Sequence, residues 1–267
     1  MEWQNKVAAM ALRPLYAAYE LRLMRQVTDQ PMPRHIGLIL DGNRRFGHLR
    51  GVTDPREIYM RGAAKLDEVL AWCDEFAIGA VTLWVCSTDN LARPPEQVTG
   101  ILQAVEAKLS SLVNDVHVHR RRIRVQTIGR RDCLPASTRE VISAAERATA
   151  HYNQRVLTIA IAYGGREEIV DAVRALLEDC RQQDLSLRDA IERVTPESIS
   201  RYLYLANMPE PDLLIRTSGE VRLSGFLLWQ SAYSEFYFSD ALWPAFRKID
   251  FLRAVRAFQQ RRRRFGL

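Results

Sequence analysis

Two arginines and several hydroxyl groups gather in segment 212–230, where their types and spacing suit the binding of an oligoanion. An apolar run ends at Arg216, a turn of threonine, serine and glycine follows, and Arg222 and Ser224 precede a second apolar run. Open α/β sheets bind ligands beyond the carboxyl ends of their strands. Forked guanidinium donors match a diphosphate well. The segment therefore indicates a diphosphate site, and the alternative is a surface turn with solvated arginines.

A second polar segment follows the apolar run at residues 35–40. It places Asp41 at the end of an expected strand, then a glycine that permits close backbone approach, then two arginines after Asn43. Mg²⁺ typically takes one or two carboxylates together with phosphate oxygens, so this segment predicts a magnesium and phosphate site. Asp-Gly and Gly-Asn are also common turn dipeptides, and a plain turn is the alternative.

Further segments complete an ordered set of motifs. They are Asp-Gly-Asn-Arg-Arg at 41–45, Ser-Thr-Asp-Asn-x-x-Arg-Pro at 87–94, Ala-Tyr-Gly-Gly-Arg at 162–166, the segment 212–235 with Trp243-Pro244, and Arg-Phe-Gly at 264–266. Together they resemble the signatures of the cis-prenyltransferases, the undecaprenyl diphosphate synthase family. Residues 1–30 carry no such motif. With the Asn-Arg-Arg run, they resemble the short-product, Z-farnesyl diphosphate synthase-like members of actinobacterial type.

The resemblance implies that the chain extends an allylic diphosphate with isopentenyl diphosphate and forms a cis double bond, with Mg²⁺ as cofactor. The expected contacts of the allylic diphosphate are Gly42, Asn43, Arg44, Arg45 and Arg93. Those of isopentenyl diphosphate are Arg216, Arg222 and Ser224. Asp41 and Glu235 are the expected Mg²⁺ ligands, Glu235 acting from the partner subunit. The candidate catalytic residues are Asp41 and, as a polar relay near the departing proton, Asn43, Ser87 and Asn90.

Three expected substrate-binding positions depart from the family pattern. Asp89 replaces the usual Glu, Phe46 the usual Trp, and Tyr59 a frequent His, and Pro55 stands where a basic residue is usual. These changes keep irregular, non-head-to-tail prenyl coupling open as an alternative. A non-catalytic family subunit is a further alternative, which the intact Asp-Gly-Asn-Arg element disfavours.

The resemblance also implies a homodimer and an apolar tunnel for the product. In the family, the motif matching residues 264–266 reaches the isopentenyl diphosphate site of the neighbouring subunit. The expected tunnel wall is Trp84, Val85, Leu102, Val105 and Leu109. Alternation along a strand places Val85 on the same side as Ser87, beside the chemistry. A valine there favours a short product of about fifteen to twenty carbons, because overfilling a cavity is costly.

Composition bounds the remaining possibilities. The chain has 267 residues, 47% hydrophobic content and a net charge of +6, which suits one core and an anionic partner. Nucleic acid is disfavoured because no aromatic platforms interleave with the basic runs. The chain contains no run of 18 apolar residues, so no membrane span is expected. Its first residues lack the pattern of a secretory signal. Four scattered cysteines argue against a zinc or disulfide framework and fit a reducing cytoplasm.

Strands and helices are expected to alternate after a first helix at 8–26, which either packs on the core or touches a membrane surface as an amphipathic helix. The expected strands are 35–40, 80–86, 122–127, 156–162, 212–216 and 235–238. The later helices are expected at 57–76, 95–115, 136–150, 166–182, 187–193, 196–203 and 250–263. His117 and His119 have strand-like spacing, for which a structural role is favoured over a metal site. The pattern predicts one α/β domain, residues 34–267, with a mostly parallel six-stranded sheet flanked by helices, after a helical extension at 1–33.

Overall fold

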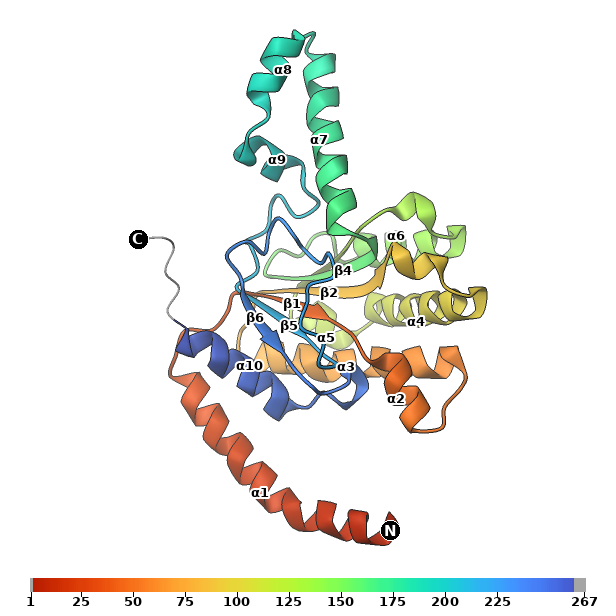
Figure 1. Cartoon of the computed structure of the whole chain (residues 1–267), viewed down its shortest axis with the longest axis vertical. Coiled ribbons are helices and arrows are strands. Elements are labelled where there is room, and N and C mark those ends of the chain that lie inside the picture. The colour runs from red at the N-terminus through yellow and green to blue at the C-terminus, as the bar shows by residue number, and fades with distance from the viewer. Residues whose placement is uncertain (1, 262–267) are drawn as a thin grey trace.

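The centre of the chain is a six-stranded sheet with the order β3-β4-β2-β1-β5-β6 (Figure 1). The computed structural model describes the backbone of residues 2–261 and the side chains of residues 14–261. The strands are β1 (His35–Ile39), β2 (Ala80–Ser87), β3 (Ile123–Ile128), β4 (Arg155–Tyr163), β5 (Leu213–Arg216) and β6 (Glu235–Phe238). All five strand pairings are parallel, so the predicted α/β class with a parallel sheet is confirmed.

Helices lie between the strands from β1 to β5, whereas residues 217–234 join β5 to β6 without a helix. The helices are α1 (Glu2–Thr28), α2 (Asn43–Leu49), α3 (Pro55–Glu75), α4 (Pro95–Val113), α5 (Val116–Arg120), α6 (Ala136–Thr149), α7 (Gly165–Gln182), α8 (Leu187–Arg193), α9 (Pro196–Tyr202) and α10 (Lys248–Gln260). Short 3-10 turns lie at Asp89–Ala92, Arg131–Cys133 and Trp243–Ala245. Proline begins α3, α4 and α9, where its missing N–H costs nothing.

The two faces of the sheet are covered differently. On one face, alternate strand residues such as Leu38 and Leu83 pack against α3, α4, α6 and α10. On the other face, Ile39 and Leu214 pack against Leu205, from the chain between α9 and β5, and Phe226, from the irregular chain between β5 and β6. A non-helical segment therefore closes one side of the core.

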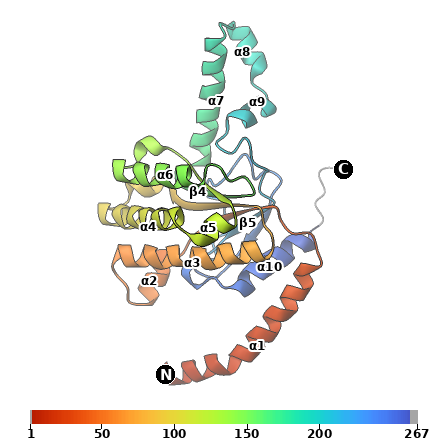
Figure 2. The same cartoon turned by 180° about the vertical axis from the view of Figure 1, so that it is seen from behind.

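Two helical elements extend from this body (Figures 1 and 2). Helix α7 projects far from the sheet, and α8 and α9 fold back along it through a small cluster around Leu176, Cys180 and Ala190. Helix α1 packs on α10, where Leu23 and Val27 are fully buried. No described helix is long and apolar enough to cross a membrane.

Short helices account for the main differences from the predicted elements. The strand-like spacing of His117 and His119 is misleading, because both lie in α5, whose first turn is capped by the Asp115 carboxylate. That carboxylate accepts hydrogen bonds from the backbone N–H groups of His117 at 2.7 Å and Val118 at 3.4 Å. Helix α2 was also not predicted, because its first residues were interpreted as part of a ligand-binding turn.

Candidate active site

Four neighbouring strands bring polar groups to one edge of the sheet. Asp41 follows β1, Ser87 ends β2, Tyr163 ends β4 and Arg216 ends β5. Because these strands are adjacent and parallel, their carboxyl ends meet, as the sequence predicted for Asp41, Ser87 and Arg216. The edge opens into a polar cleft of about 700 Å³.

Most of the predicted site residues line this polar cleft. They are Asp41, Gly42, Asn43, Arg44, Arg45, Tyr59, Ser87, Asp89, Asn90, Arg93, Arg216, Arg222 and Ser224. Phe46 and Glu235 are not among its lining residues. The Phe46 ring lies under the guanidinium of Arg50, with the Arg50 Cζ 5.4 Å from the ring centroid. Glu235 begins β6, opposite the start of β5, and accepts a hydrogen bond of 2.6 Å from Arg261.

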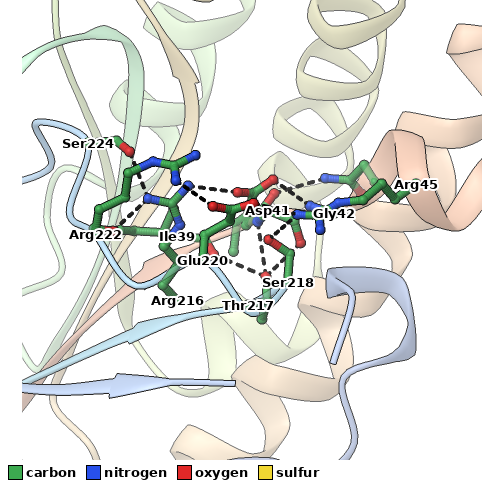
Figure 3. Close-up of polar contacts among 12 residues, drawn as sticks. Ile39, Asp41, Gly42, Arg45, Arg216, Thr217, Ser218, Glu220, Arg222 and Ser224 are labelled. Carbon is green, nitrogen blue, oxygen red and sulfur yellow. Dashed lines mark hydrogen bonds and ion pairs between the residues drawn. The ribbon is translucent and has the colours of Figure 1, made fainter. Parts of the chain in front are cut away.

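Asp41 and Arg216 form an ion pair at the centre of the cleft (Figure 3). The Asp41 Oδ2 accepts from the Arg216 Nη2 at 2.8 Å, and the Arg216 Nη1 donates to the Ser224 Oγ at 2.7 Å and to the backbone carbonyl of Arg222 at 2.6 Å. Burial would raise the pKa of Asp41, but the hydrogen bond and charge of Arg216 outweigh it and lower that pKa. Asp41 is therefore a stable carboxylate at neutral pH.

Thr217 joins the two loops that carry this pair. Its hydroxyl donates to the backbone carbonyl of Asp41 at 2.7 Å and accepts from the Asp41 N–H at 3.0 Å. Gly42 follows with φ at +100°, a left-handed conformation, and an added Cβ would lie 2.8 Å from Leu242. Glycine is required there for both reasons. The turn leads directly into α2, which presents Arg44 and Arg45 to the cleft.

Glu220 bridges arginines of the two expected diphosphate sites (Figure 3). Its carboxylate lies 3.5 Å from the Arg45 Nη2 and is also paired with Arg222. Arg45 further donates to the Ser218 Oγ at 2.7 Å. Neither Glu220 nor Ser218 was assigned a role from the sequence. The sequence did contain a signal for Glu220, because this carboxylate lies between the candidate arginines Arg216 and Arg222.

Ser87 and Asn90 form a reciprocal pair at the end of β2. The backbone N–H of Asn90 donates to the Ser87 Oγ at 3.1 Å, and the backbone N–H of Ser87 donates to the Asn90 Oδ1 at 3.2 Å. Asp89 begins the 3-10 turn, which contains Asn90 and ends before Arg93. The Arg93 Nη1 lies 3.4 Å from the Tyr59 hydroxyl, whose pKa is raised by burial. These contacts fix the second polar wall of the cleft.

Asn43 lies where the polar cleft meets an apolar pocket. Its Nδ2 donates to the Leu40 carbonyl at 2.9 Å. Its Oδ1 is buried and has no hydrogen-bond partner among the described residues. A Cβ added to Gly62 would lie 2.2 Å from that oxygen, so the glycine makes room for it. Asn43 thus presents a polar group where the polar cleft and the apolar pocket meet.

The apolar pocket lies between α3, α4 and the sheet and has a volume of about 60 Å³. It shares Leu40, Asn43, Tyr59, Val85 and Ile101 with the polar cleft. Val85, Val105 and Leu109 line it as predicted, but Trp84 and Leu102 do not.

The prediction for Trp84 was wrong because its ring lies on the opposite face of the sheet. There it stacks on Phe226, with ring centroids 5.4 Å apart and an interplanar angle of 9°. The register between β2 and β4 shifts between Trp84 and Cys86, which leaves Val85 as an extra residue in β2. Leu83 and Val85 both line the apolar pocket, so the alternation of a strand directs Trp84, which lies between them, to the other face.

Comparison with known proteins agrees with this geometry. Residues 39–266 match the family described as putative undecaprenyl diphosphate synthase. The chain belongs to this family of cis-prenyltransferases. It is 52% identical over 254 residues to an isoprenyl transferase of Thermus thermophilus, covering 95% of this chain and 96% of the relative. It is 50% identical over 253 residues to a (2Z,6E)-farnesyl diphosphate synthase of Thermobifida fusca, covering 95% and 97%.

A solved structure extends the comparison to the fold. The crystal structure of lavandulyl diphosphate synthase from Lavandula x intermedia, in complex with dimethylallyl diphosphate, has a TM-score of 0.79 and 31% identity to this cis-prenyltransferase. The match covers 88% of this chain and 99% of that one. The chain is therefore an enzyme that transfers prenyl groups in cis-prenyl chain elongation.

The donor set of this cis-prenyltransferase fits a magnesium ion held largely by substrate. Within the described residues, no three His, Cys, Asp or Glu side chains gather as a metal site. Asp41 nevertheless presents a partly exposed carboxylate to the cleft, beside the arginines that suit a diphosphate. Mg²⁺ commonly binds one or two carboxylates together with phosphate oxygens and water. Asp41 is the residue that fits this role.

Proposed function

We propose that this enzyme condenses isopentenyl diphosphate with an allylic diphosphate, in a Mg²⁺-dependent reaction, to give a short Z-configured prenyl diphosphate. The observation that carries the proposal is the junction of two sites. A cleft rich in arginine opens directly into an apolar pocket, and Asn43, Tyr59 and Val85 line both. A diphosphate with a hydrocarbon tail has this same division between charge and apolar surface.

The arginines fall into two groups that suit two diphosphates. Arg44, Arg45 and Arg93 lie on the side of α2 and β2, and we assign them to the allylic diphosphate. Arg216 and Arg222 lie beyond β5, and with Ser224 we assign them to isopentenyl diphosphate. Guanidinium groups bind such anions through paired hydrogen bonds. Two cationic groups reduce the repulsion between the diphosphates when both bind side by side.

The reaction breaks the allylic carbon–oxygen bond, whose electrons leave with the diphosphate. A carbon–carbon bond forms to the isopentenyl double bond, and a proton leaves the isopentenyl carbon. Magnesium, when bound, supplies charge that stabilises the departing diphosphate, and Asp41 would hold it. Asn43, Ser87 and Asn90 face the cleft and are the candidates for relaying the proton.

The short product is supported by the position of Val85 in the apolar pocket. Val85 lines the end of the pocket that borders the polar cleft. A prenyl tail that fills this space stops growing when further lengthening would overpack the wall. We assign a product of about fifteen to twenty carbons on this basis.

We further propose that the enzyme acts as a homodimer in the cytoplasm. Glu235 supports the dimer, because β6 is parallel to β5 and its first residue pairs with Leu213. Glu235 therefore lies at the amino edge of its strand, while Asp41 lies at the carboxyl edge of the sheet. A metal ligand role for Glu235 requires a second subunit. Residues 264–266, which we expect to reach the neighbouring site, lie outside the described residues.

The experiment that tests the function is an incubation of the purified enzyme with Mg²⁺, labelled isopentenyl diphosphate and allylic primers of different length. We expect Z-configured prenyl diphosphates with a narrow length distribution. Products formed from an allylic diphosphate alone would instead support irregular coupling, which the departures at Tyr59 and Asp89 left open. Absence of any product under both conditions would contradict the proposed activity.

A further inference from the structure

A charged residue lines the apolar pocket. Lys108 of α4 is one of its lining residues, and only 12% of the lysine side chain is exposed. Its ammonium group pairs with Asp67 of α3, whose side chain is 58% exposed. The lysine stem therefore lies along the apolar wall while its charge turns outward to the surface, as long amphipathic side chains do.

The positions of the lining residues place Lys108 at the end of the pocket away from the polar cleft. On α4 the wall runs from Ile101 through Val105 to Lys108, and on α3 it runs from Tyr59 to Leu66. Each series covers about two helical turns, or about 11 Å. Tyr59 and Ile101 also line the polar cleft, so they mark the entrance. Lys108 and its partner Asp67, which follows Leu66 on α3, mark the opposite end.

A prenyl tail that grows past this point meets an energetic barrier. The pair of Asp67 and Lys108 ties α3 to α4 across the outer end of the pocket. A hydrocarbon that passes between the helices must separate the pair. It must also leave the ammonium of Lys108 without its carboxylate partner on a side chain that is only 12% exposed, and poor solvation of an unpaired charge is unfavourable.

We propose that the Asp67–Lys108 ion pair closes the far end of the product pocket and thereby limits the length of the prenyl chain. The inference rests on the proposed function, because it takes the apolar pocket as the site of the growing tail. It assigns a specificity role to two residues outside the polar cleft. Neither residue contacts the diphosphate-binding arginines in the described structure.

The chain offers a matched control in Lys65. Its side chain is also 12% exposed, and its ammonium pairs with Glu68 at 2.8 Å. Both residues lie on α3, so this pair does not join two helices, and Lys65 does not line the apolar pocket. Lys65→Ala therefore removes an equally buried lysine and an ion pair without opening the pocket.

The test compares product lengths from labelled isopentenyl diphosphate and one allylic primer by chromatography and mass spectrometry. Lys108→Ala and Asp67→Ala should each give products at least one five-carbon unit longer than the wild type, while Lys65→Ala should give wild-type products. Lys108→Met keeps the volume of the stem and serves if the alanine variant does not fold. It should also lengthen the products, because its uncharged, flexible end can be displaced.

The outcomes separate this inference from the proposed function. Unchanged product lengths in active Lys108 and Asp67 variants would overturn the closing role. Lengthening by Lys108→Ala alone would overturn the role of the pair, and equal lengthening by Lys65→Ala would show a general loosening of the fold. If the wild type makes no elongated product with any primer, the proposed function fails and this inference fails with it.

Discussion

The Asp41 Oδ2 and the Arg216 Nη2 lie 2.8 Å apart, although the two residues are separated by 175 positions in the sequence. The pair joins the loop after β1 to the end of β5. In the free enzyme, the carboxylate assigned to the metal and the guanidinium assigned to the substrate are therefore paired with each other. Binding of magnesium by Asp41 and of diphosphate by Arg216 must exchange this contact for contacts with ligand.

Asp41→Ala should reduce turnover by a factor of about 10² to 10³, because loss of a group that stabilises transition-state charge costs about 2.7–4 kcal/mol. Steady-state kinetics, with circular dichroism to check folding, measure the effect. Asp132→Ala removes an exposed carboxylate outside the polar cleft and is the control. A variant at position 41 that retains more than about a tenth of the activity contradicts the role of Asp41.

The same pair should make stability depend on pH. The pKa of Asp41 is lowered from its ordinary value of 3.8, so the pair stabilises the fold above that value. The contribution is lost as the pH falls from about 4 through the lower folded-state pKa. Asp41→Asn should therefore cost about 1 kcal/mol of unfolding free energy at pH 7, after allowance for partial exposure, and clearly less near pH 3. Urea denaturation at the two pH values measures this, and an equal cost at both would exclude the ion pair as its cause.

Arg222→Ala should raise KM for isopentenyl diphosphate more than KM for the allylic primer. A hydrogen bond to a charged group contributes about 1.5–3 kcal/mol, or roughly tenfold to a hundredfold in affinity. Arg222→Lys should restore part of the affinity, because lysine keeps the charge but lacks the fork. Equal increases in the two KM values would contradict the assignment of the two diphosphate sites.

Glu220→Gln should affect diphosphate binding in the opposite direction to Arg222→Ala. It removes the carboxylate that pairs with both Arg45 and Arg222. Partly exposed ion pairs are worth about 0.2–1 kcal/mol, so the release of the arginines should tighten binding of inorganic pyrophosphate by up to about fivefold. Isothermal titration calorimetry with inorganic pyrophosphate shows whether the affinity of the variant rises or falls. Weaker binding would mean that Glu220 positions the arginines rather than competing for them.

Val85→Ala should lengthen the products by at least one five-carbon unit, because it widens the pocket where Val85 borders the polar cleft. Product analysis by mass spectrometry tests this. Trp84→Phe is the control: it changes a large neighbouring ring on the opposite face of the sheet, and should leave product length unchanged. Unchanged products from Val85→Ala would show that Val85 does not contribute to the length limit, and wild-type products of fifty carbons or more would contradict a limit in this pocket.

Deletion of residues 264–267 should reduce activity while the fold is retained, because the proposed role of this segment lies in the neighbouring subunit. Activity assays combined with light scattering and thermal unfolding distinguish loss of catalysis from loss of structure. A truncated enzyme that is monomeric and fully active would contradict both the dimer and the role of the segment.

The sequence predicted the strands closely because each is an apolar run bounded by polar residues. The strand predicted at 35–40 is observed at His35–Ile39. The strand predicted at 212–216 is observed at Leu213–Arg216. The gathering of Asp41, Ser87 and Arg216 followed from topology, since parallel neighbours end at one edge. The place of Glu235 at the opposite edge could have been inferred in the same way, because it begins its own apolar run.

Other features depend on contacts that no local pattern specifies. The bulge at Val85 arises from the register between β2 and β4, and it is visible only when the two strands pair. Glu220 reaches Arg45 because two loops distant in sequence fold against each other. The helix that contains His117 and His119 is short, and its cap at Asp115 was the one local signal.

The irregular chain between β5 and β6 performs two tasks at once. Phe226 and Leu227 seal one face of the sheet, and Arg222 and Ser224 of the same segment face the polar cleft. Ligand occupancy and local unfolding of this cover are therefore thermodynamically linked, because a ligand that binds only the closed form suppresses opening. Isopentenyl diphosphate should thus slow hydrogen exchange in β5 as well as in the loop, and a protease that cuts between residues 217 and 231 would report substrate concentration.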